Sequence, residues 1–163
     1  MSKLESLPNE ILTDILEKYT NGVDLLRIFS FQLNQRFDTL ITQCQRVRFD
    51  FIQCQKDDFR FCMELVPAYL DKIEELAISE QDTPGQVNAF LSLFPSFELF
   101  KQLRTLYIHF DDDAIDWRII ERALNSLSQT AIETLSIKSM NTDIFNGKLF
   151  FIDRQQEKKI TPS

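Results

Sequence analysis

The sequence has few glycines, few basic residues and no long apolar run, and each of these gaps excludes a class of function. With only 3 glycines in 163 residues, the chain lacks the glycine-rich loops that bind phosphates and the residues that favour tight β-hairpins. The 18 basic residues are outnumbered by 25 acidic ones, for a net charge of −7, so nucleic acid and anionic membranes are poor partners. No apolar run approaches the roughly 20 residues of a membrane-spanning helix, and we expect no membrane segment.

Cysteine is also scarce and lacks a metal-binding or redox pattern. Cys44, Cys54 and Cys62 are odd in number and show no Cys-x-x-Cys spacing, which argues against a disulfide framework. We expect them to pack as small apolar residues in a reducing compartment, the cytoplasm or the nucleus. The first six residues contain no apolar core, so we expect no signal peptide.

Residue types that carry out catalysis are not grouped in the sequence. His109 is the single histidine and has no suitable partner nearby, although a nucleophile–base pair needs one within hydrogen-bond reach. The aspartates at 111–113 and 116 lack the alternating spacing, the glycine and the distal glutamate of a calcium loop. A solvated turn that caps a helix explains them better. We expect no catalytic residue, no metal site and no cofactor, and the alternative is an enzyme hidden in an irregular α/β fold.

What the sequence does contain begins with three short amphipathic helices before residue 43. Pro8 is predicted at the first helical position, and apolar residues then follow helical spacing on one face up to Tyr19. We expect Asp24 to cap a second helix and Asn34 to cap a third. A segment of about 40 residues rarely forms a stable core alone, so we expect part of its apolar surface to be exposed for a partner. The residues expected to be exposed are Leu7, Pro8, Ile11, Leu12, Leu25 and Leu26.

The order of residues in this segment resembles an F-box. The resemblance is carried by Leu7-Pro8-Asn9-Glu10-Ile11-Leu12, Ile15-Leu16, Asp24-Leu25-Leu26, Leu33-Asn34-Gln35-Arg36-Phe37 and Leu40-Ile41. Tyr19 stands where the family commonly has leucine, and Phe37 stands where it often has tryptophan. The resemblance implies docking to the Skp-type adaptor of a cullin–RING ubiquitin ligase of the SCF type. The adaptor-binding residues that it implies are Leu7, Pro8, Ile11, Leu12, Ile15, Leu16, Leu25 and Leu26.

The remainder of the chain contains a repeat. Apolar residues at i, i+3 and i+5 begin at Ile73, Leu103 and Ile132, which are 30 and 29 residues apart, and a softer copy begins at Cys44. A strand and a helix in each unit of this length resemble leucine-rich repeats, although the asparagine expected shortly after each strand is missing. The pattern predicts that three leucines point inward from adjacent parallel strands, namely Leu76, Leu106 and Leu135.

Helix signals fall between the predicted strands. The segment 83–86 fits a capping box with proline at the first helical position, and Asp116 can cap a later helix. Four phenylalanines have the spacing of a buried helix face, so we expect core packing rather than a ligand pocket. They are Phe90, Phe94, Phe97 and Phe100.

Side chains that alternate with the inward ones form the opposite face of the predicted sheet. Two readings fit this face, a target-binding surface centred on Tyr107 and His109 or an ordinary solvated sheet. The candidate target-binding residues are Tyr107, His109, Ser79, Ser136 and Lys138.

The fold expected from these patterns is α/β (α+β). A three-helix F-box at residues 1–43 packs on a short, irregular leucine-rich-repeat solenoid with parallel strands at 44–152, and 153–163 is a polar tail. We expect residues 148–152 to begin a further strand, or residues 149–152 to fold back as a cap on the last repeat. The predicted function is a substrate receptor whose helices bind the Skp-type adaptor and whose repeats bind an unknown target protein. The alternative within the same fold is a protein-interaction scaffold without ligase docking.

Overall fold

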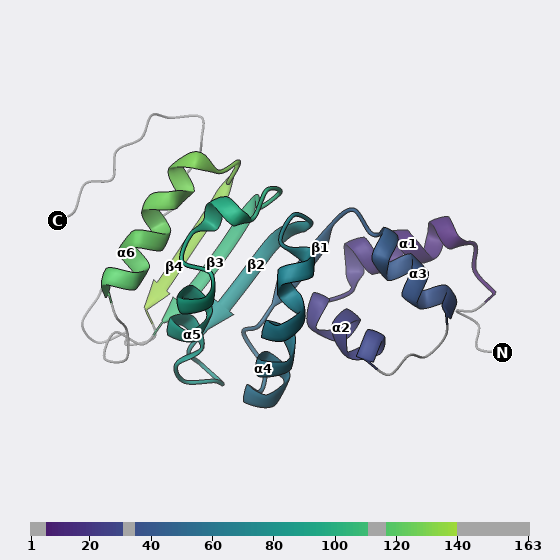
Figure 1. Ribbon diagram of the computed structural model, residues 1–163, viewed down its shortest axis with the longest axis horizontal. Helices are drawn as coiled ribbons and strands as arrows, with labels where there is room; N and C mark the ends of the chain where they lie inside the picture. The colour runs from purple at the N-terminus through teal and green to yellow at the C-terminus, as the bar shows by residue number, and fades with distance from the viewer. Residues whose placement is uncertain (1–5, 31–34, 111–116, 140–163) are drawn as a thin grey trace.

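The chain folds as a mixed α/β protein built on one parallel sheet (Figure 1). The computed structural model describes residues 6–30, 35–110 and 117–139, and within them six α-helices accompany four strands. The helices are α1 (Asn9–Tyr19), α2 (Gly22–Ser30), α3 (Gln35–Gln43), α4 (Lys56–Leu65), α5 (Gln86–Leu93) and α6 (Trp117–Ser126). The strands are β1 (Val47–Asp50), β2 (Ile73–Ser79), β3 (Thr105–Phe110) and β4 (Thr134–Ser139). Short 3-10 turns cover Val66–Tyr69, Phe97–Leu99 and Leu127–Gln129.

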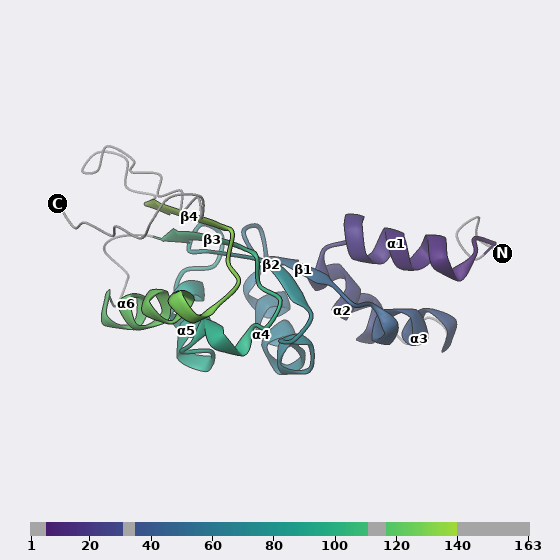
Figure 2. The ribbon, with the colours of Figure 1, turned by 90° about the horizontal axis from the view of Figure 1, so that it is seen from above.

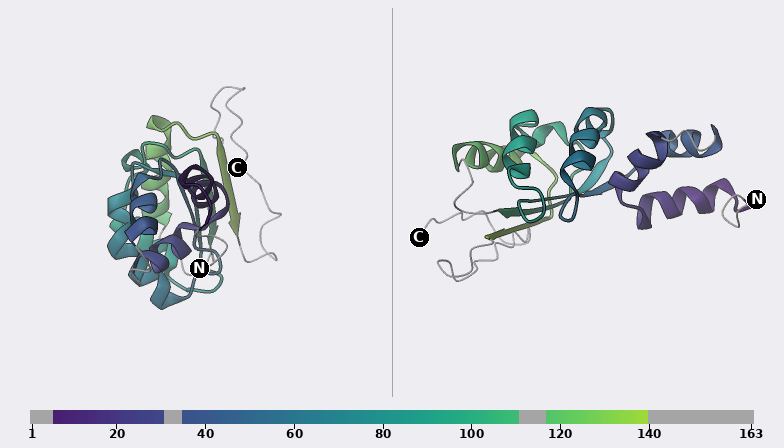
Figure 3. Two further views of the ribbon diagram at one scale, coloured as in Figure 1. Left: turned by 90° about the vertical axis from the view of Figure 1, so that its right-hand side faces the viewer. Right: turned by 90° about the horizontal axis from the view of Figure 1, so that it is seen from below.

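The four strands lie side by side in chain order, and each adjacent pair is parallel. Helices α4, α5 and α6 cover one face of the sheet (Figure 2), and the bundle of α1, α2 and α3 stands at its β1 end (Figure 3). Leu76, Leu106 and Leu135 are direct neighbours on adjacent strands and are all buried. The prediction that these leucines point inward and stack is therefore confirmed.

The register of β1 differs from the spacing found in the sequence. That spacing aligns Val47 with Leu76, whereas Phe49 is the residue paired with Leu76. The pairing offset is 26 residues at Val47 and, after a register shift between Val47 and Arg48, 27 residues from Arg48 on, whereas the sequence pattern has 29. Val47 and Phe49 are nevertheless the inward residues of β1, as the spacing predicts. Phe51 is also buried, and its ring stacks on that of Phe49 with centroids 5.5 Å apart.

Two helix starts also differ from the sequence prediction, by one and three residues. Pro8 lies just before α1 with an extended ψ of 152°, and its carbonyl accepts the Leu12 N–H at 3.1 Å. Helix α2 begins at Gly22, and its cap is Asn21, whose Oδ1 accepts the Val23 N–H at 3.1 Å. Asp24, the predicted cap, lies in the first turn instead. The Asn34 and Asp116 caps, the segment 149–152 and the tail 153–163 lie outside the described residues.

The predicted capping box at 83–86 does not form. Helix α5 begins at Gln86, and Gly85 precedes it in the left-handed region with φ of 82°. The Thr83 hydroxyl donates instead to the Cys54 carbonyl at 2.6 Å. The cap comes from the buried carboxylate of Glu80, which accepts the N–H groups of Gly85 and Val87.

The buried apolar side chains form a single core that runs from Leu12 in α1 to Leu135 in β4. The helical segment and the sheet therefore share one core across residue 43. Phe90, Phe94, Phe97 and Phe100 are buried in it as expected. Helix α5 ends at Leu93, however, so these four rings do not lie on one helix face.

The three cysteines are free and buried in this core. Burial raises the pKa of the Cys44 and Cys54 thiols to about 11 and that of Cys62 to about 12. Packing as small apolar residues, which the sequence predicts, is confirmed.

Candidate functional site

Helix α1 carries an exposed apolar stripe. Ile11 is 48% exposed and Tyr19 is 79% exposed, and Ile15 lies between them, partly buried, at helical spacing. Pro8, just ahead of the helix, is also exposed. We call Pro8, Ile11, Ile15 and Tyr19 the α1 stripe. Exposed apolar side chains that are adjacent on a helix form a candidate surface for protein contact.

Four of the eight predicted adaptor-binding residues are not on this surface. Leu12, Leu16, Leu25 and Leu26 are all buried in the core, so the expectation that three of them are exposed is wrong. The sheet explains the difference, because α2 and α1 contact β1 and the bundle is not limited to its own interior. The sequence prediction considered only the apolar surface that a segment of about 40 residues can bury by itself.

Leu7 is partly buried and packs against the core. Its carbonyl accepts a hydrogen bond from Nη2 of Arg36 in α3, and Nε of Arg36 donates to Asn9 Oδ1 at 2.8 Å. A single guanidinium group therefore fixes the start of α1 against α3. The position of the α1 stripe is set by this contact at one end of the helix.

A second contact fixes the bundle to the sheet. Asn21 forms a parallel bridge with Arg48 of β1. The Asn21 side chain also accepts the Asp50 N–H at 3.1 Å and donates to the Asp50 carbonyl at 2.8 Å. Gly22 packs so closely on Phe49 that a Cβ there would lie 2.6 Å from ring atom Cε1. The turn between α1 and α2 thus lies beside β1 and pairs with it through a single parallel bridge.

The missing asparagine ladder is replaced by another set of turn residues. Asn21, Asp50 and Ser79 each accept the N–H two residues further on, at 3.1, 2.8 and 3.0 Å. Asn21 and Asp50 are 29 residues apart, and Ser79 continues that period. Short polar side chains stabilise such turns by accepting a local backbone N–H. The sequence prediction missed these residues because three different residue types perform the same role.

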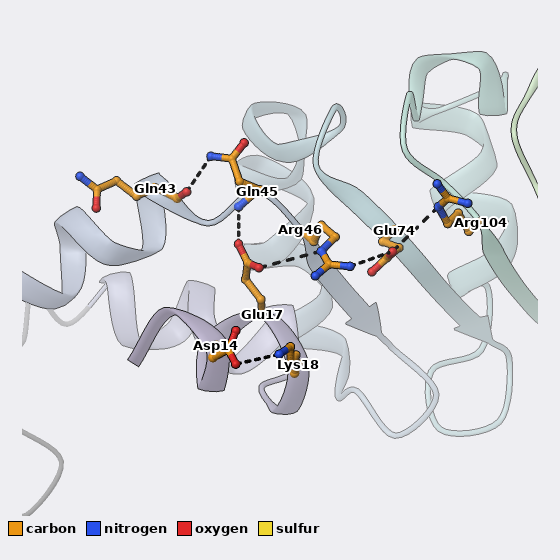
Figure 4. Close-up of polar contacts among 8 residues, drawn as sticks. All are labelled: Asp14, Glu17, Lys18, Gln43, Gln45, Arg46, Glu74 and Arg104. Atoms are coloured by element: carbon orange, nitrogen blue, oxygen red, sulfur yellow. Dashed lines mark hydrogen bonds and ion pairs between the residues drawn. The ribbon is translucent and has the colours of Figure 1, made fainter. Parts of the chain in front are cut away.

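A row of alternating charges crosses the amino-terminal ends of the strands (Figure 4). Glu17 of α1 lies 3.9 Å from Arg46, which lies 3.6 Å from Glu74. Glu74 lies 4.0 Å from Arg104, and Arg104 pairs with Glu133. Glu17 also accepts the Gln45 N–H at 2.6 Å. We call these five residues the charge row. Arg104 and Glu133 are 29 residues apart. Charges of alternating sign at about this spacing are visible in the sequence and could have predicted the row.

The sheet face opposite α4, α5 and α6 presents rows of side chains set by the strand register. Asp50, Ala77, Tyr107 and Ser136 are neighbours in one row. The next row along the strands consists of Ser79, His109 and Lys138. Tyr107, His109 and Ser136 are partly exposed and Lys138 is exposed, so the structure brings four of the five predicted target-binding residues together on one face.

Ser79 is the exception in this set, because it is fully buried. Its hydroxyl accepts the Gln81 N–H at 3.0 Å, and its own N–H donates to Gln86 Oε1 at 2.9 Å. The Gln86 side chain also donates to the Phe51 carbonyl at 3.1 Å. Ser79 therefore shapes the end of β2, and direct contact with a target is not available to it.

The electrostatics of this face differ between its two edges. Burial lowers the pKa of His109 and the nearby Lys138 lowers it further, while Asp50 raises it. His109 is therefore neutral at pH 7. Lys138 on β4 supplies a positive charge at one edge, and Asp50 on β1 supplies a negative charge at the other.

A cleft of about 490 Å³ opens beside Asp50. It lies where the end of β1 and the following loop meet α2 and α4. Its charged lining consists of Asp24, Asp50, Asp58 and Arg27, with Arg27 3.5 Å from Asp58. The sequence prediction missed this cleft because its residues come from segments that only the fold brings together.

No family model, curated relative or solved structure matches the chain. Among residues 6–30, 35–110 and 117–139, no helix has the length and apolar character needed to cross a membrane. Over the same residues, three or more potential metal ligands are never grouped together. Two surfaces of the described residues are candidate binding sites: the α1 stripe and the face that carries Tyr107, His109, Ser136 and Lys138, which we call the open sheet face.

Proposed function

We propose that this protein is a substrate receptor of an SCF-type cullin–RING ubiquitin ligase, located in the cytoplasm or the nucleus. In this proposal the three helices are an F-box that binds the Skp-type adaptor, and the sheet with its helices is a short leucine-rich-repeat solenoid that binds a target protein. The protein performs no chemistry itself. The observation that carries the proposal is the α1 stripe, which is exposed on a helix built from the residues that resemble the F-box.

The proposed docking surface is smaller than the resemblance implies. Pro8, Ile11 and Tyr19 are the accessible apolar groups, and Leu7 and Ile15 contribute their exposed edges. Leu12, Leu16, Leu25 and Leu26 support docking indirectly, because they hold α1 and α2 in place from the core. Apolar anchors surrounded by polar residues are typical of the centre of a protein interface.

The proposed target surface is the open sheet face. Tyr107 is partly exposed and lies between two small residues, Ala77 and Ser136, so we expect its ring to be accessible to a partner. Tyrosine is a frequent hot spot because its ring gives a large contact area at low entropic cost. We expect Tyr107→Ala to weaken target binding by about 2 kcal/mol or more and to leave adaptor binding unchanged.

The experiment for docking compares two exposed apolar residues. Ile11→Asp places a charge in the α1 stripe, and Leu93→Asp places one at a site of similar exposure, 57%, at the end of α5. Calorimetry with the purified Skp-type adaptor should show binding for wild type and Leu93→Asp and a loss of at least tenfold for Ile11→Asp. Equal affinities for the three proteins would contradict the F-box assignment.

The burial of the four leucines favours a second candidate, a protein-interaction scaffold with no ligase docking. In that case the bundle serves only to cover the β1 edge of the sheet. The same calorimetry separates the two candidates, because the scaffold would not bind the adaptor at all. Target binding that depends on Tyr107 would be retained in both.

A further inference from the structure

The open sheet face has an ordered arrangement of charge, shape and aromatic surface that specifies more than a general binding surface. At the β1 edge, Asp50 belongs both to the row of Tyr107 and to the lining of the cleft. At the β4 edge, the exposed Lys138 points from the same face. Tyr107 lies between these two charges on β3.

The β1 edge carries more acidic than basic side chains, even when the ion pairs within the protein are taken into account. The carboxylates of Asp24, Asp50 and Asp58 line the cleft, where Arg27 is the only basic residue. Arg48 is paired in register with Glu75 on β2, so these two charges offset one another. An arginine or lysine side chain of a partner would therefore be attracted to this edge.

The β4 edge has the opposite sign. Lys138 is exposed, and its neighbour across the register on β3 is His109. Glu133 belongs to the charge row at the other end of the strands, where it pairs with Arg104. A carboxylate of a partner would be attracted to Lys138.

The strand spacing fixes the distance between the two charges. Strands lie about 4.8 Å apart, so the three steps from β1 to β4 span about 14 Å. Lys138 also lies two residues further along its strand than the row of Asp50, which brings the separation of the two Cα atoms to about 16 Å. An extended peptide rises about 3.3 Å per residue, and every second side chain lies on the same side. Residues i and i+4 of such a peptide therefore share one side and, with long side chains, reach both charges.

We infer that the target segment recognised by this face is an extended peptide with a basic residue at one end, an acidic residue four positions away and an apolar residue between them. The basic side chain pairs with Asp50 at the β1 edge, the apolar side chain covers Tyr107, and the carboxylate pairs with Lys138. This inference rests on the proposed target-binding function and adds the chemistry of the target.

The probes are four acetylated, fluorescein-labelled peptides. The spaced peptide is Arg-Ala-Leu-Ala-Glu, and the adjacent peptide has the same composition with arginine and glutamate next to each other. Two further peptides replace the arginine or the glutamate of the spaced peptide by glutamine. Binding to the full chain is measured by fluorescence anisotropy up to millimolar protein.

The protein variants remove one charge at a time. Asp50→Asn retains the oxygen that accepts the Ile52 N–H, so the turn after β1 is preserved. Lys138→Gln changes an exposed residue. Asp71→Asn and Lys101→Gln remove exposed charges away from the open face and are the matched controls.

The expected result is a set of paired losses. The spaced peptide should bind better than the adjacent one, and each of the two variants should weaken it by about two- to fivefold, the range for an exposed ion pair. Asp50→Asn should not weaken the peptide that lacks arginine, Lys138→Gln should not weaken the peptide that lacks glutamate, and the controls should bind like wild type. Added salt should reduce the preference.

The inference is overturned if the spaced peptide has no advantage, if no peptide binds, or if the two variants weaken charged and neutral peptides equally. This failure differs from failure of the proposed target surface. Loss of peptide binding in Tyr107→Ala without any effect of Asp50→Asn or Lys138→Gln would keep the surface and reject the charge arrangement. Full peptide and target binding by Tyr107→Ala would reject the surface itself.

Discussion

Gly22 packs closely against Phe49, so we expect one added methyl group at residue 22 to weaken the contact between α2 and β1. A Cβ at residue 22 would lie 2.6, 2.7 and 2.8 Å from three atoms of the Phe49 ring. The ring cannot move easily, because it is buried and stacked on Phe51 at 5.5 Å. Overpacking a filled core costs about 1–3 kcal/mol, and the better helix propensity of alanine returns at most about 1 kcal/mol. We expect Gly22→Ala to lower the free energy of unfolding by about 1–2 kcal/mol.

Urea unfolding followed by circular dichroism measures this loss. Phe49→Val removes the three ring atoms that the methyl group meets, so Gly22→Ala should be neutral or stabilising in that background. Gly85→Ala is the control, because its Cβ meets nothing within 4 Å while its φ of 82° disfavours alanine. Its cost of about 1–2 kcal/mol should be the same in both backgrounds. A Gly22→Ala protein as stable as wild type would refute the reasoning.

Three further predictions concern the core, the charge row and pH. Leu106→Ala removes the central stacked leucine and should cost about 2–5 kcal/mol in the same urea assay; an unchanged midpoint would contradict the packing. Glu17→Ala removes the acceptor of the exposed Gln45 N–H and should cost about 0.5–1.5 kcal/mol, whereas Glu133→Ala at the exposed end should cost less, between about 0 and 1 kcal/mol; the reverse order would show that the row does not stabilise the bundle. The pKa of His109 is lowered on folding from its ordinary value of 6.5, so the unfolded chain binds the proton more readily and stability should fall as pH drops below about 6.5. Replacement by glutamine should flatten that part of the pH profile, and an identical profile would exclude His109 as its source.

The inward leucines and the helix faces were predictable because each depends on local periodicity. Leu76, Leu106 and Leu135 repeat at a spacing that one unit specifies and the next reproduces. The inward position of Phe49 was predictable in the same way, but the register of β1 was not, since it contains a shift that the spacing does not encode.

The candidate sites also contain residues that local patterns predict and residues whose position depends on the packing of distant segments. Tyr107, His109 and Lys138 were placed on one face by alternation along the strands, and that prediction agrees with the register. The burial of Leu12 and Leu26 was missed because it depends on how α1 and α2 pack against α3, α4 and β1. The cleft beside Asp50 was missed because its residues come from α2, β1 and α4, which are separated in the sequence and adjacent only in the folded chain.

The alternating signs of the charge row restrict how such a chain grows by duplication. Each unit contributes one charge, and Glu17, Arg46, Glu74, Arg104 and Glu133 take opposite signs in turn. Inserting one copied unit sets two like charges side by side, which is destabilising at this separation. Inserting two units together preserves the alternation along the whole edge. Gain or loss of strand–helix segments in pairs therefore keeps the charges alternating, whereas a single inserted segment leaves one pair of like charges in the row.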